Sequence, residues 1–430
     1  MFSDTQTQAL VVAGEIPEAL IQVARDRNVR VLIANRRGQR AGDWVLSAPE
    51  NASAERNQDA PPNGGDVALY LHTSGTTARP KLVSILHSSI LSTANSISRS
   101  LELTAEDCSL CIMPLFHVHG LVAALLAPLR AGGRVWCAPG FQPGRFHEWL
   151  IESGASWYTA VPTMHQAILL RAPRQHGGLR SHRLRLIRSC SAPLPEAIWT
   201  QLRTAFGVPV VQGYGMTEAA HQISSTSLVD ESCEMGSVGR STGPEIAIMT
   251  PDGNLQPTEQ TGEVVLRGES VIQAYASPVE ANFAFSQGWF RTGDQGYIDA
   301  HGNLRLTGRL KELINRGGEK ISPYELEEVL LRHDGVEQAV AFAVPDHLLG
   351  EAVGVAVVPK PDADMTELRL RAWCRQVLAP HKVPREVVMV DQLPRGSTGK
   401  LQRMGLAGYF GLGRNGARVS TPISTLVHPD

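Results

Sequence analysis

Short apolar runs alternate with apolar positions at helical spacing over the first half of the chain. A helix is predicted over 17–26, leading into a buried strand at 29–34, and the polar stretch 47–66 is typical of a loop or linker. Further strands are predicted at 67–72, 109–113, 134–137, 156–159, 184–189 and 208–212. Helices are predicted between them, around 90–97 and over 143–152, 162–171 and 195–206. Strands alternating with helices favour an α/β fold with a largely parallel sheet.

The pattern changes after residue 235, where short strands and Gly-containing turns predict a small β-rich subdomain that ends near 308. Ser322, Pro323 and Glu325 then have the order expected at a helix start: an N-cap, a first-turn proline and an acidic third position. Strands at 338–344, 352–358 and 386–390 and a helix at 366–378 complete a compact α+β module. We therefore predict an N-terminal domain over 1–308, a small C-terminal domain over 309–410 and a loosely ordered tail over 411–430.

Composition narrows the class of protein. A chain of 430 residues is too long for one core, and 43% hydrophobic with 19% charged residues is ordinary for a soluble enzyme. A formal charge of −2 predicts no nucleic-acid partner and no basic membrane-binding face. Apolar stretches are too short to span a bilayer, and the start does not resemble a secretory leader. Six scattered cysteines indicate reduced thiols, and Cys108 and Cys111 are better explained by a buried strand than by a metal site. The expected location is the cytoplasm.

The clearest local feature is the turn from His72 to Lys81, which follows an apolar run. Its hydroxyls, glycine and terminal lysine are groups that a polyphosphate needs, since hydroxyls and backbone N–H groups donate to phosphate oxygens and lysine supplies charge. It is not a Walker A loop. Considered alone, such a run is more often an exposed polar turn.

Five blocks in one order make that simpler interpretation untenable. They read TSGTTARPK at 73–81, YGMTE at 214–218, GWFRTGD at 288–294, GRLKELINRGGEKISPYELE at 308–327 and PRGSTGK at 394–400. Together they resemble the adenylate-forming superfamily of acyl-CoA synthetases, carrier-protein adenylation domains and luciferases. The resemblance covers about 65–410 and implies a large layered α/β N-terminal domain with a small mobile α+β domain after it.

The resemblance implies how the chain would hold MgATP. The β- and γ-phosphates would be bound by the turn residues Thr73, Ser74, Gly75, Thr76, Thr77 and Lys81. Thr217 would bond the α-phosphate and Glu218 would hold Mg²⁺, a cation that prefers hard oxygen ligands. Gly213 and Tyr214 would flank the adenine. Asp294 would accept the ribose hydroxyls, with Arg309 beside it.

The C-terminal blocks carry roles in the two half-reactions by the same resemblance. Lys400 would enter the site to stabilise the α-phosphate and the acid oxygens while the mixed anhydride forms. Lys311 would be the hinge on which the small domain swings. Gly317 and Gly318, with Glu319 and Lys320, would form the loop presented to the acyl-adenylate when coenzyme A reacts.

The acid pocket is less strongly indicated. His117, His119, His221 and Ser191, with Arg188 nearby, lie where the carboxylate is expected. A lone histidine is more often structural, but several polar groups together suit a small acid with a second polar or anionic group better than an acyl chain. The stretches PLFHVHG, IRSCSAPL and YGMTEAAH are similar to the oxalate–CoA ligase branch. Oxalate is the first expectation, and malonate or another short acid the next.

Some features depart from the family pattern. Only 72 residues precede Thr73, so the first subdomain is predicted to be incomplete at its start. Ala78 and Leu82 stand where glycine is usual. Two other functions stay open, namely delivery of the acid to a separate carrier protein or an amine, and a truncated inactive nucleotide-binding homologue. The chain is expected to be a monomer or homodimer.

Overall fold

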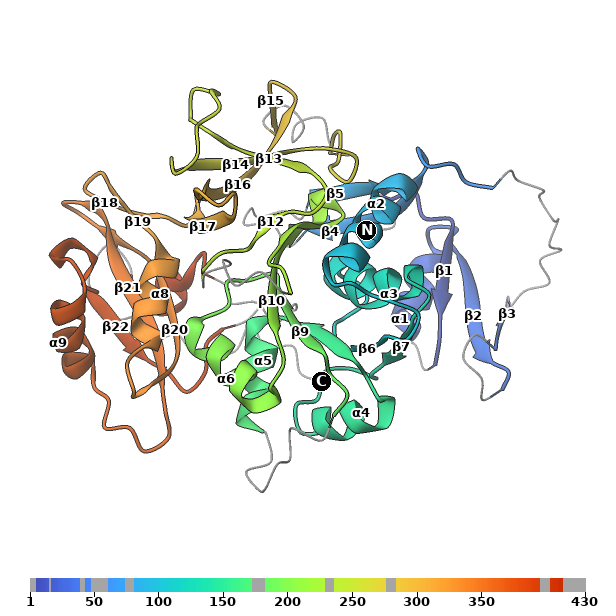
Figure 1. Cartoon of the computed structure of the whole chain (residues 1–430), viewed down its shortest axis with the longest axis horizontal. Coiled ribbons are helices and arrows are strands. Elements are labelled where there is room, and N and C mark those ends of the chain that lie inside the picture. The colour runs from blue at the N-terminus through green and yellow to red at the C-terminus, as the bar shows by residue number, and fades with distance from the viewer. Residues whose placement is uncertain are drawn as a thin grey trace. The chain divides into compact units, whose positions relative to one another are not determined.

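The computed structural model describes residues 5–14, 17–38, 43–47, 61–73, 81–171, 182–228, 236–275, 284–394 and 403–412 (Figure 1). The chain separates into two units, residues 1–66 and residues 67–430. The predicted domain boundary near 309 lies inside the second unit and stays a prediction. The linker predicted over 47–66 and the tail over 411–430 fall mostly outside the described residues.

The first unit is a small sheet with one helix. Parallel strands β1 (Ala9–Val12) and β2 (Arg30–Arg36) flank helix α1 (Glu18–Arg25), and β3 (Trp44–Ser47) runs antiparallel to β2. The apolar side chains of Val12, Ala24, Val29 and Val31 form its core. The predicted helix and strand at this end of the chain are confirmed, but the strand is not buried as predicted, since Val31 is the one buried residue of β2.

A seven-stranded sheet is the centre of the second unit. Its order is β12-β11-β10-β9-β8-β6-β7, in which the five strands from β10 to β7 are parallel and β11 and β12 are antiparallel. The strands are β6 (Cys108–Cys111), β7 (Arg134–Cys137), β8 (Trp157–Ala160), β9 (Leu186–Cys190), β10 (Val210–Met216), β11 (His221–Ser225) and β12 (Arg240–Ser241). The predicted largely parallel α/β sheet is confirmed, and Cys108 and Cys111 lie in the buried strand that was expected.

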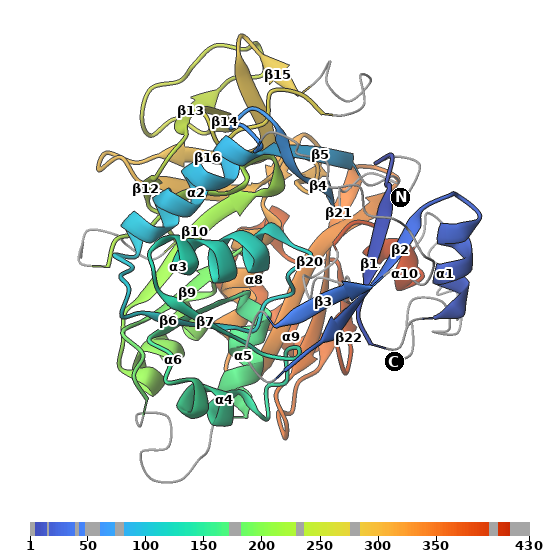
Figure 2. The same ribbon diagram turned by 90° about the vertical axis from the view of Figure 1, so that its right-hand side faces the viewer.

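Helices cover both faces of this sheet (Figure 2). On one face, α2 (His87–Ser100), the π-helix η1 (His119–Leu126) and α3 (Ala127–Arg130) contribute to a core with Trp157 and Val211. On the other, α4 (Phe146–Ser153), α5 (Pro162–Leu170) and α6 (Glu196–Phe206) pack through aromatic and aliphatic side chains. In such sheets ligands bind at the carboxyl ends of the parallel strands.

The strand predicted at 67–72 was wrongly assigned to the parallel sheet. It is β4 (Val67–Thr73), which pairs antiparallel with β5 (Lys81–Leu86) in a separate two-stranded sheet. β5 was missed because its apolar residues follow a polar turn and run directly into a helix. The pairing places Thr73 opposite Lys81, so both ends of the predicted phosphate turn lie side by side.

Two further sheets follow along the chain. The β-rich segment is a five-stranded antiparallel sheet of β13 (Glu245–Met249), β14 (Gly262–Arg267), β15 (Phe285–Ser286), β16 (Trp289–Ile298) and β17 (Leu304–Arg309). The last sheet contains β18 (Ile314–Arg316), β19 (Glu319–Ile321), β20 (Val336–Asp346), β21 (Gly350–Pro359) and β22 (Glu386–Met389). Its helices are α8 (Pro323–Leu331), α9 (Glu367–Val377) and the short α10 (Leu406–Tyr409).

The start of α8 follows the predicted capping pattern. The Ser322 hydroxyl accepts a hydrogen bond from the backbone N–H of Glu325 at 3.4 Å, and Pro323 occupies the first helical position. The fold class expected from the sequence, layered α/β followed by a small α+β module, is confirmed. Within the described residues, no helix has the length and apolar character needed to cross a membrane.

Candidate active site

A cavity of about 1720 Å³ opens where the carboxyl ends of β8, β9 and β10 meet the β-rich sheet and helix α8. Most predicted site residues line it, although they come from six separate stretches of the sequence. These are Thr73, Lys81, His117, His119, Ser191, Gly213, Tyr214, Thr217, Glu218, His221, Asp294, Arg309 and Lys311. Gly317 and Gly318 do not line it. Ser74, Gly75, Thr76, Thr77 and Lys400 lie outside the described residues.

Backbone conformation at the strand ends aims several of these residues into the cavity. Ser191, Ala220 and His221 have φ values of 74°, 51° and 119°, which L-amino acids rarely adopt. Such strain persists only where the surrounding structure enforces it, and it concentrates at functional sites. Gly215 serves the same turn, because a Cβ there would lie 1.8 Å from the carbonyl oxygen of His221. The β10–β11 turn is thus built to present the segment from Thr217 to His221.

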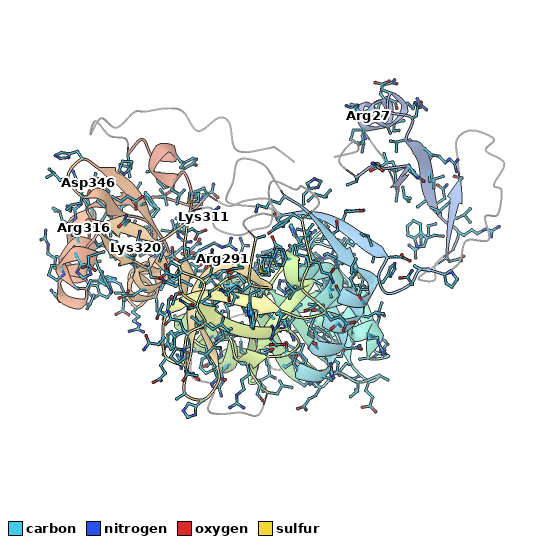
Figure 3. All side chains as sticks on the ribbon, turned by 90° about the horizontal axis from the view of Figure 1, so that it is seen from above. Arg27, Arg291, Lys311, Arg316, Lys320 and Asp346 are labelled. Atoms are coloured by element: carbon cyan, nitrogen blue, oxygen red, sulfur yellow. The ribbon has the colours of Figure 1, made fainter. Side chains whose placement is uncertain are left out.

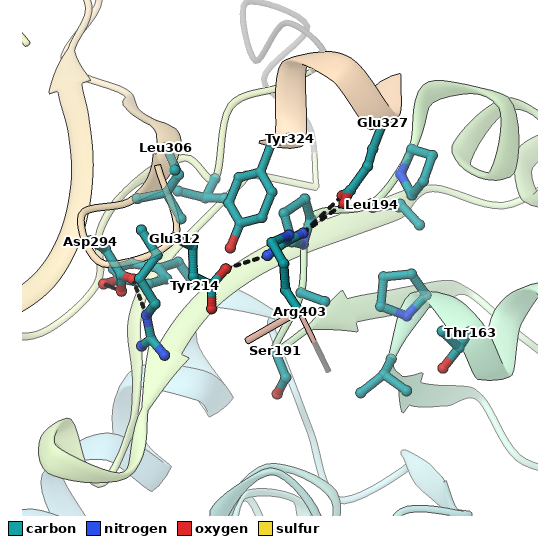
Figure 4. A pocket seen from close by; sticks show the side chains of 18 of the residues that line it. Thr163, Ser191, Leu194, Tyr214, Asp294, Leu306, Glu312, Tyr324, Glu327 and Arg403 are labelled. Carbon is teal, nitrogen blue, oxygen red and sulfur yellow. Dashed lines mark hydrogen bonds and ion pairs between the residues drawn. The ribbon is translucent and has the colours of Figure 1, made fainter. Parts of the chain in front are cut away.

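Asp294 is held from two sides at the boundary between β10 and the β-rich sheet. Its Oδ2 accepts a hydrogen bond from the Tyr214 hydroxyl at 2.6 Å, and its Oδ1 accepts one from Nε of Arg309 at 2.8 Å (Figure 4). Burial, followed by the Asp294 charge, raises the pKa of Tyr214 well above its ordinary value. The Asp294 charge likewise raises the pKa of Arg309. The carboxylate therefore has a fixed orientation and stays available as a hydrogen-bond acceptor.

Glu218 and Lys81 are linked by Tyr275, a residue that the sequence motifs did not indicate. The Tyr275 hydroxyl donates to Oε1 of Glu218 at 2.9 Å, and the Lys81 ammonium lies 4.5 Å from the centre of the Tyr275 ring. Glu218 is buried on the short 3₁₀ turn Thr217–Ala219. Because Mg²⁺ is commonly bound by one or two carboxylates plus phosphate oxygens, this single carboxylate fits such an ion. Over the described ranges, no cluster of three or more His, Cys, Asp or Glu residues offers a complete metal cage.

The predicted acid end of the cavity contains a hydrogen-bonded polar cluster. The His119 and His221 rings stack with centroids 5.1 Å apart and planes 20° apart. Nδ1 of His119 lies 3.1 Å from the Ser191 hydroxyl, and Nε2 lies 2.6 Å from the Thr159 hydroxyl. The structure thus brings His119, His221 and Ser191 together. His117 lines the same cavity, with its ring 4.4 Å from that of Phe116.

Arg188 supports this cluster from behind. Its side chain is fully buried, and its Nη2 donates to Nε2 of His221 at 3.3 Å and to Oε1 of Gln222 at 2.9 Å. Its Nη1 donates to the Thr159 hydroxyl at 3.2 Å. Thr159 was not predicted as a site residue, because a threonine in an apolar strand gives no signal until the strand order is known.

Arg403 forms a second ion cluster that the motifs did not reveal. It is bound by Glu312 and by both oxygens of Glu327, at 2.8 and 3.0 Å for the latter, and its guanidinium lies 5.0 Å from the Tyr324 ring centre (Figure 4). All four residues line the cavity. Arg403 therefore anchors the segment just after the PRGSTGK block to the start of the C-terminal sheet and helix α8.

The β18–β19 turn lies elsewhere. Figure 3 labels Arg316 and Lys320 on the C-terminal sheet, to the left of Lys311 and Arg291. Gly317 and Gly318 at this turn have φ values of 62° and 98°. Glycine takes these values without cost, so the loop keeps a shape that other residues would strain.

Comparison with known families gives two matches along the chain. The family described as AMP-binding enzyme matches residues 1–276, and the AMP-binding enzyme C-terminal domain matches residues 325–400.

Curated relatives are CoA ligases. An oxalate–CoA ligase from Arabidopsis thaliana is 45% identical over 86% of this chain and 72% of that protein. An oxalate–CoA ligase from Saccharomyces cerevisiae is 43% identical over 80% of this chain and 63% of that protein. A sulfoacetate–CoA ligase from Cupriavidus necator is 39% identical over 81% of this chain and 68% of that protein.

Solved structures with the same fold include nucleotide complexes. ATP-bound MatB from Rhodopseudomonas palustris superposes with a TM-score of 0.82 at 26% identity, covering 95% of this chain and 80% of that one. The o-succinylbenzoate–CoA synthetase MenE from Bacillus subtilis, in complex with ATP and a magnesium ion, gives a TM-score of 0.76 at 28% identity, covering 94% and 79%.

Proposed function

The chain belongs to the AMP-binding enzyme family and is a ligase of the acyl-CoA synthetase type, and from that premise we propose that it activates a small dianionic acid, oxalate first, for transfer to coenzyme A. In the first step a carboxylate oxygen of the acid attacks the α-phosphorus of ATP, forming acyl-AMP and releasing pyrophosphate. In the second the thiolate of coenzyme A attacks the acyl carbonyl, forming the thioester and releasing AMP. The observation that carries the choice of acid is the polar cluster of Ser191, His119 and His221.

The nucleotide is assigned to the wider part of the cavity. Asp294, held by Tyr214 and Arg309, accepts the two ribose hydroxyls, for which a carboxylate is a natural partner. Gly213 and Tyr214 flank the adenine, and Thr217 bonds the α-phosphate. Thr73 and Lys81, paired across β4 and β5, line the cavity and are assigned to the β- and γ-phosphates. ATP complexes of MatB and MenE, which share the fold, support a nucleotide at this cavity.

Magnesium is assigned to Glu218. Its buried carboxylate accepts one hydrogen bond from Tyr275, and within the described chain no Lys or Arg forms an ion pair with it. Bound there, the ion would neutralise phosphate charge during displacement of pyrophosphate. Tyr275 contacts both groups. Its hydroxyl orients the Glu218 carboxylate, and its ring faces the Lys81 ammonium.

Small size and double charge are what the acid pocket favours. A buried carboxylate must be hydrogen-bonded or paired, and the imidazoles and the Ser191 hydroxyl provide donors that an acyl chain would leave unused. The named acids of the relatives, oxalate in two and sulfoacetate in one, each have two anionic groups and two carbon atoms. Malonate is the next candidate.

The second half-reaction uses the C-terminal part of the chain. We assign residues 309–410 to a small domain that swings about Lys311, which removes Lys400 from the site and brings the Gly317–Gly318 turn to the acyl-adenylate. Gly317 and Gly318 do not line the cavity, so the proposal requires this movement to bring them there. We also propose a cytoplasmic enzyme, because the five described cysteines are free thiols.

The test is acid-dependent pyrophosphate release with a panel of short mono- and dicarboxylates and of long fatty acids. Oxalate is expected at or near the top, and preference for long fatty acids would refute the assignment. Thioester formed on coenzyme A supports the ligase, whereas loading of a carrier protein without reaction on coenzyme A would support the carrier alternative. An absence of pyrophosphate release with every acid would indicate an inactive homologue.

A further inference from the structure

Arg188 is a buried positive charge with only neutral partners. It is fully buried, and the groups that accept its hydrogen bonds are the Thr159 hydroxyl, the His221 imidazole and the Gln222 amide oxygen. Among the described residues, no carboxylate forms an ion pair with it. Burying an unpaired ion is very unfavourable, so a counter-charge supplied by a ligand would complete this site.

The hydrogen bonds around Arg188 can all be made with both histidines in a neutral form. A guanidinium can only donate, so Nε2 of His221 must accept and its proton lies on Nδ1. Thr159 accepts from Arg188 and, among the described residues, has Nε2 of His119 as the acceptor for its own proton. His119 then carries its proton on Nδ1 and donates it to Ser191. With the protons placed in this way both imidazoles are neutral, and the Ser191 hydroxyl can donate to a ligand.

The site around Arg188 is shaped for this charge. A Cβ on Gly213 would lie 2.7 Å from Nη2 of Arg188, so the strand next to the guanidinium needs a glycine. Both amide hydrogens of Gln222 are donated, to Ser100 at 3.0 Å and Thr242 at 3.1 Å, which turns its oxygen toward Arg188. The remaining titratable neighbour is His165 on α5, whose pKa burial lowers to about 3, so it adds no charge.

We propose that Arg188 is the positioning residue that makes the acid pocket select doubly charged acids. Its fixed charge acts on the distal anionic group through neutral His221, His119 and Ser191, and no imidazolium is required. Low-dielectric surroundings extend such a field over several ångströms. This inference rests on the proposed function and deepens it, since it names the source of the selectivity.

The test compares oxalate with glycolate, which has the same number of carbons but one carboxylate. Arg188→Gln is expected to raise KM for oxalate about 10- to 30-fold relative to glycolate, and Arg188→Lys to restore most of the preference. Gln222→Glu is the sharper probe, because it keeps the side-chain length and neutralises Arg188 in place. It also removes the two donors to Ser100 and Thr242, so its melting temperature is measured beside its kinetics. It should remove the oxalate preference while KM for ATP and kcat/KM for glycolate stay unchanged. Arg185→Gln, which removes a nearby arginine bound to Asp107, is the matched control and should keep the preference.

The dependence of KM for oxalate on pH distinguishes the charge of Arg188 from that of a protonated histidine. KM for oxalate should stay flat from about pH 6 to about pH 9 in the wild type, whereas a protonated histidine would lose oxalate binding above its ordinary pKa of about 6.5. A loss of oxalate binding above that pKa would overturn the inference. So would an unchanged oxalate preference in both Arg188→Gln and Gln222→Glu, provided that both variants melt at the native temperature. Either result would leave the proposed function standing. A wild type that activates only monocarboxylates would overturn both.

Discussion

Arg309 donates from Nε to Oδ1 of Asp294 at 2.8 Å, across the register pair that these two residues form between β16 and β17. The pairing fixes a carboxylate at the edge of the cavity and connects it to the first residue of the proposed C-terminal domain. The proposed ribose contact and the proposed start of that domain therefore lie on one ladder.

Asp294→Asn should weaken ATP binding, since one acceptor becomes a donor and the charge-assisted bond to the ribose is lost. A hydrogen bond to a charged group contributes about 1.5–3 kcal/mol, so KM for ATP should rise about 10- to 100-fold, with a smaller effect on kcat. Steady-state pyrophosphate release gives both constants. Asp299→Asn is the control, because Asp299 binds Asn303 and Arg305 beyond the end of β16 and should affect melting alone. An unchanged KM in Asp294→Asn would refute the ribose assignment.

Arg403→Met should destabilise the protein by about 3–5 kcal/mol, because it leaves Glu312 and Glu327 buried without their partner. Burial raises the pKa of Glu327, while the Arg403 charge opposes that rise. Without Arg403 the pKa of Glu327 in the folded state rises further. The folded state therefore loses most stability at the pH values at which Glu327 is ionised in the unfolded chain.

The pH dependence of that loss has a definite sign. Below the ordinary pKa of 4.5 the carboxyl is protonated whether folded or unfolded, and the variant suffers least. Its deficit should grow as pH rises from there through the raised pKa of the folded state. Thermal unfolding at about pH 5 and about pH 8 measures this, and adding Glu327→Gln should recover part of the loss at the higher pH. A deficit equal at both pH values would contradict the account.

Sequence patterns predicted the α/β layers well because buried parallel strands are continuous apolar runs. β7 and α5 coincide with their predicted segments to within a residue. The hairpin of β4 and β5 was not predicted, since pairing across a polar turn depends on register, which apolar periodicity does not specify. The π-helix from His119 to Leu126 was missed for a related reason: its residues are uniformly apolar and have no helical period.

Motif residues of the site were predicted by their types and order, and most of them line one cavity. Tyr275, Thr159 and Arg403 were not, because each acts through partners far away in sequence. Tyr275 binds a residue 57 positions earlier. Arg188 was recognised only as a neighbour of the pocket, since its lack of an acidic partner appears only when the chain is folded.

Lys400→Ala and Gly318→Ala should separate the two half-reactions. Loss of the cation at the transferring phosphoryl group should slow adenylation about 10²–10³-fold. Alanine at Gly318, where φ is 98°, should distort the turn assigned to the thioester step and leave adenylation unaffected. Pyrophosphate exchange measures the first step, and single-turnover transfer from isolated acyl-AMP measures the second. The variants are each other's controls, and equal losses in both assays would refute the division.

Cys137 should be the most reactive of the five described cysteines. It is exposed and lies in register with Cys111 on the neighbouring parallel strand, and a hydrogen bond from the Cys111 thiol lowers the pKa of Cys137 to about 7. The thiolate is the nucleophile, so iodoacetamide labelling of Cys137, followed by peptide mass spectrometry, should rise through about pH 7. Cys111→Ala removes the donor and should move the midpoint toward the ordinary value of 9.0. Cys108→Ala, on the same strand but in register with Arg134, should leave the midpoint unchanged. If Cys137 labels with the same midpoint in Cys111→Ala and in the wild type, the hydrogen bond between the two thiols is not the cause.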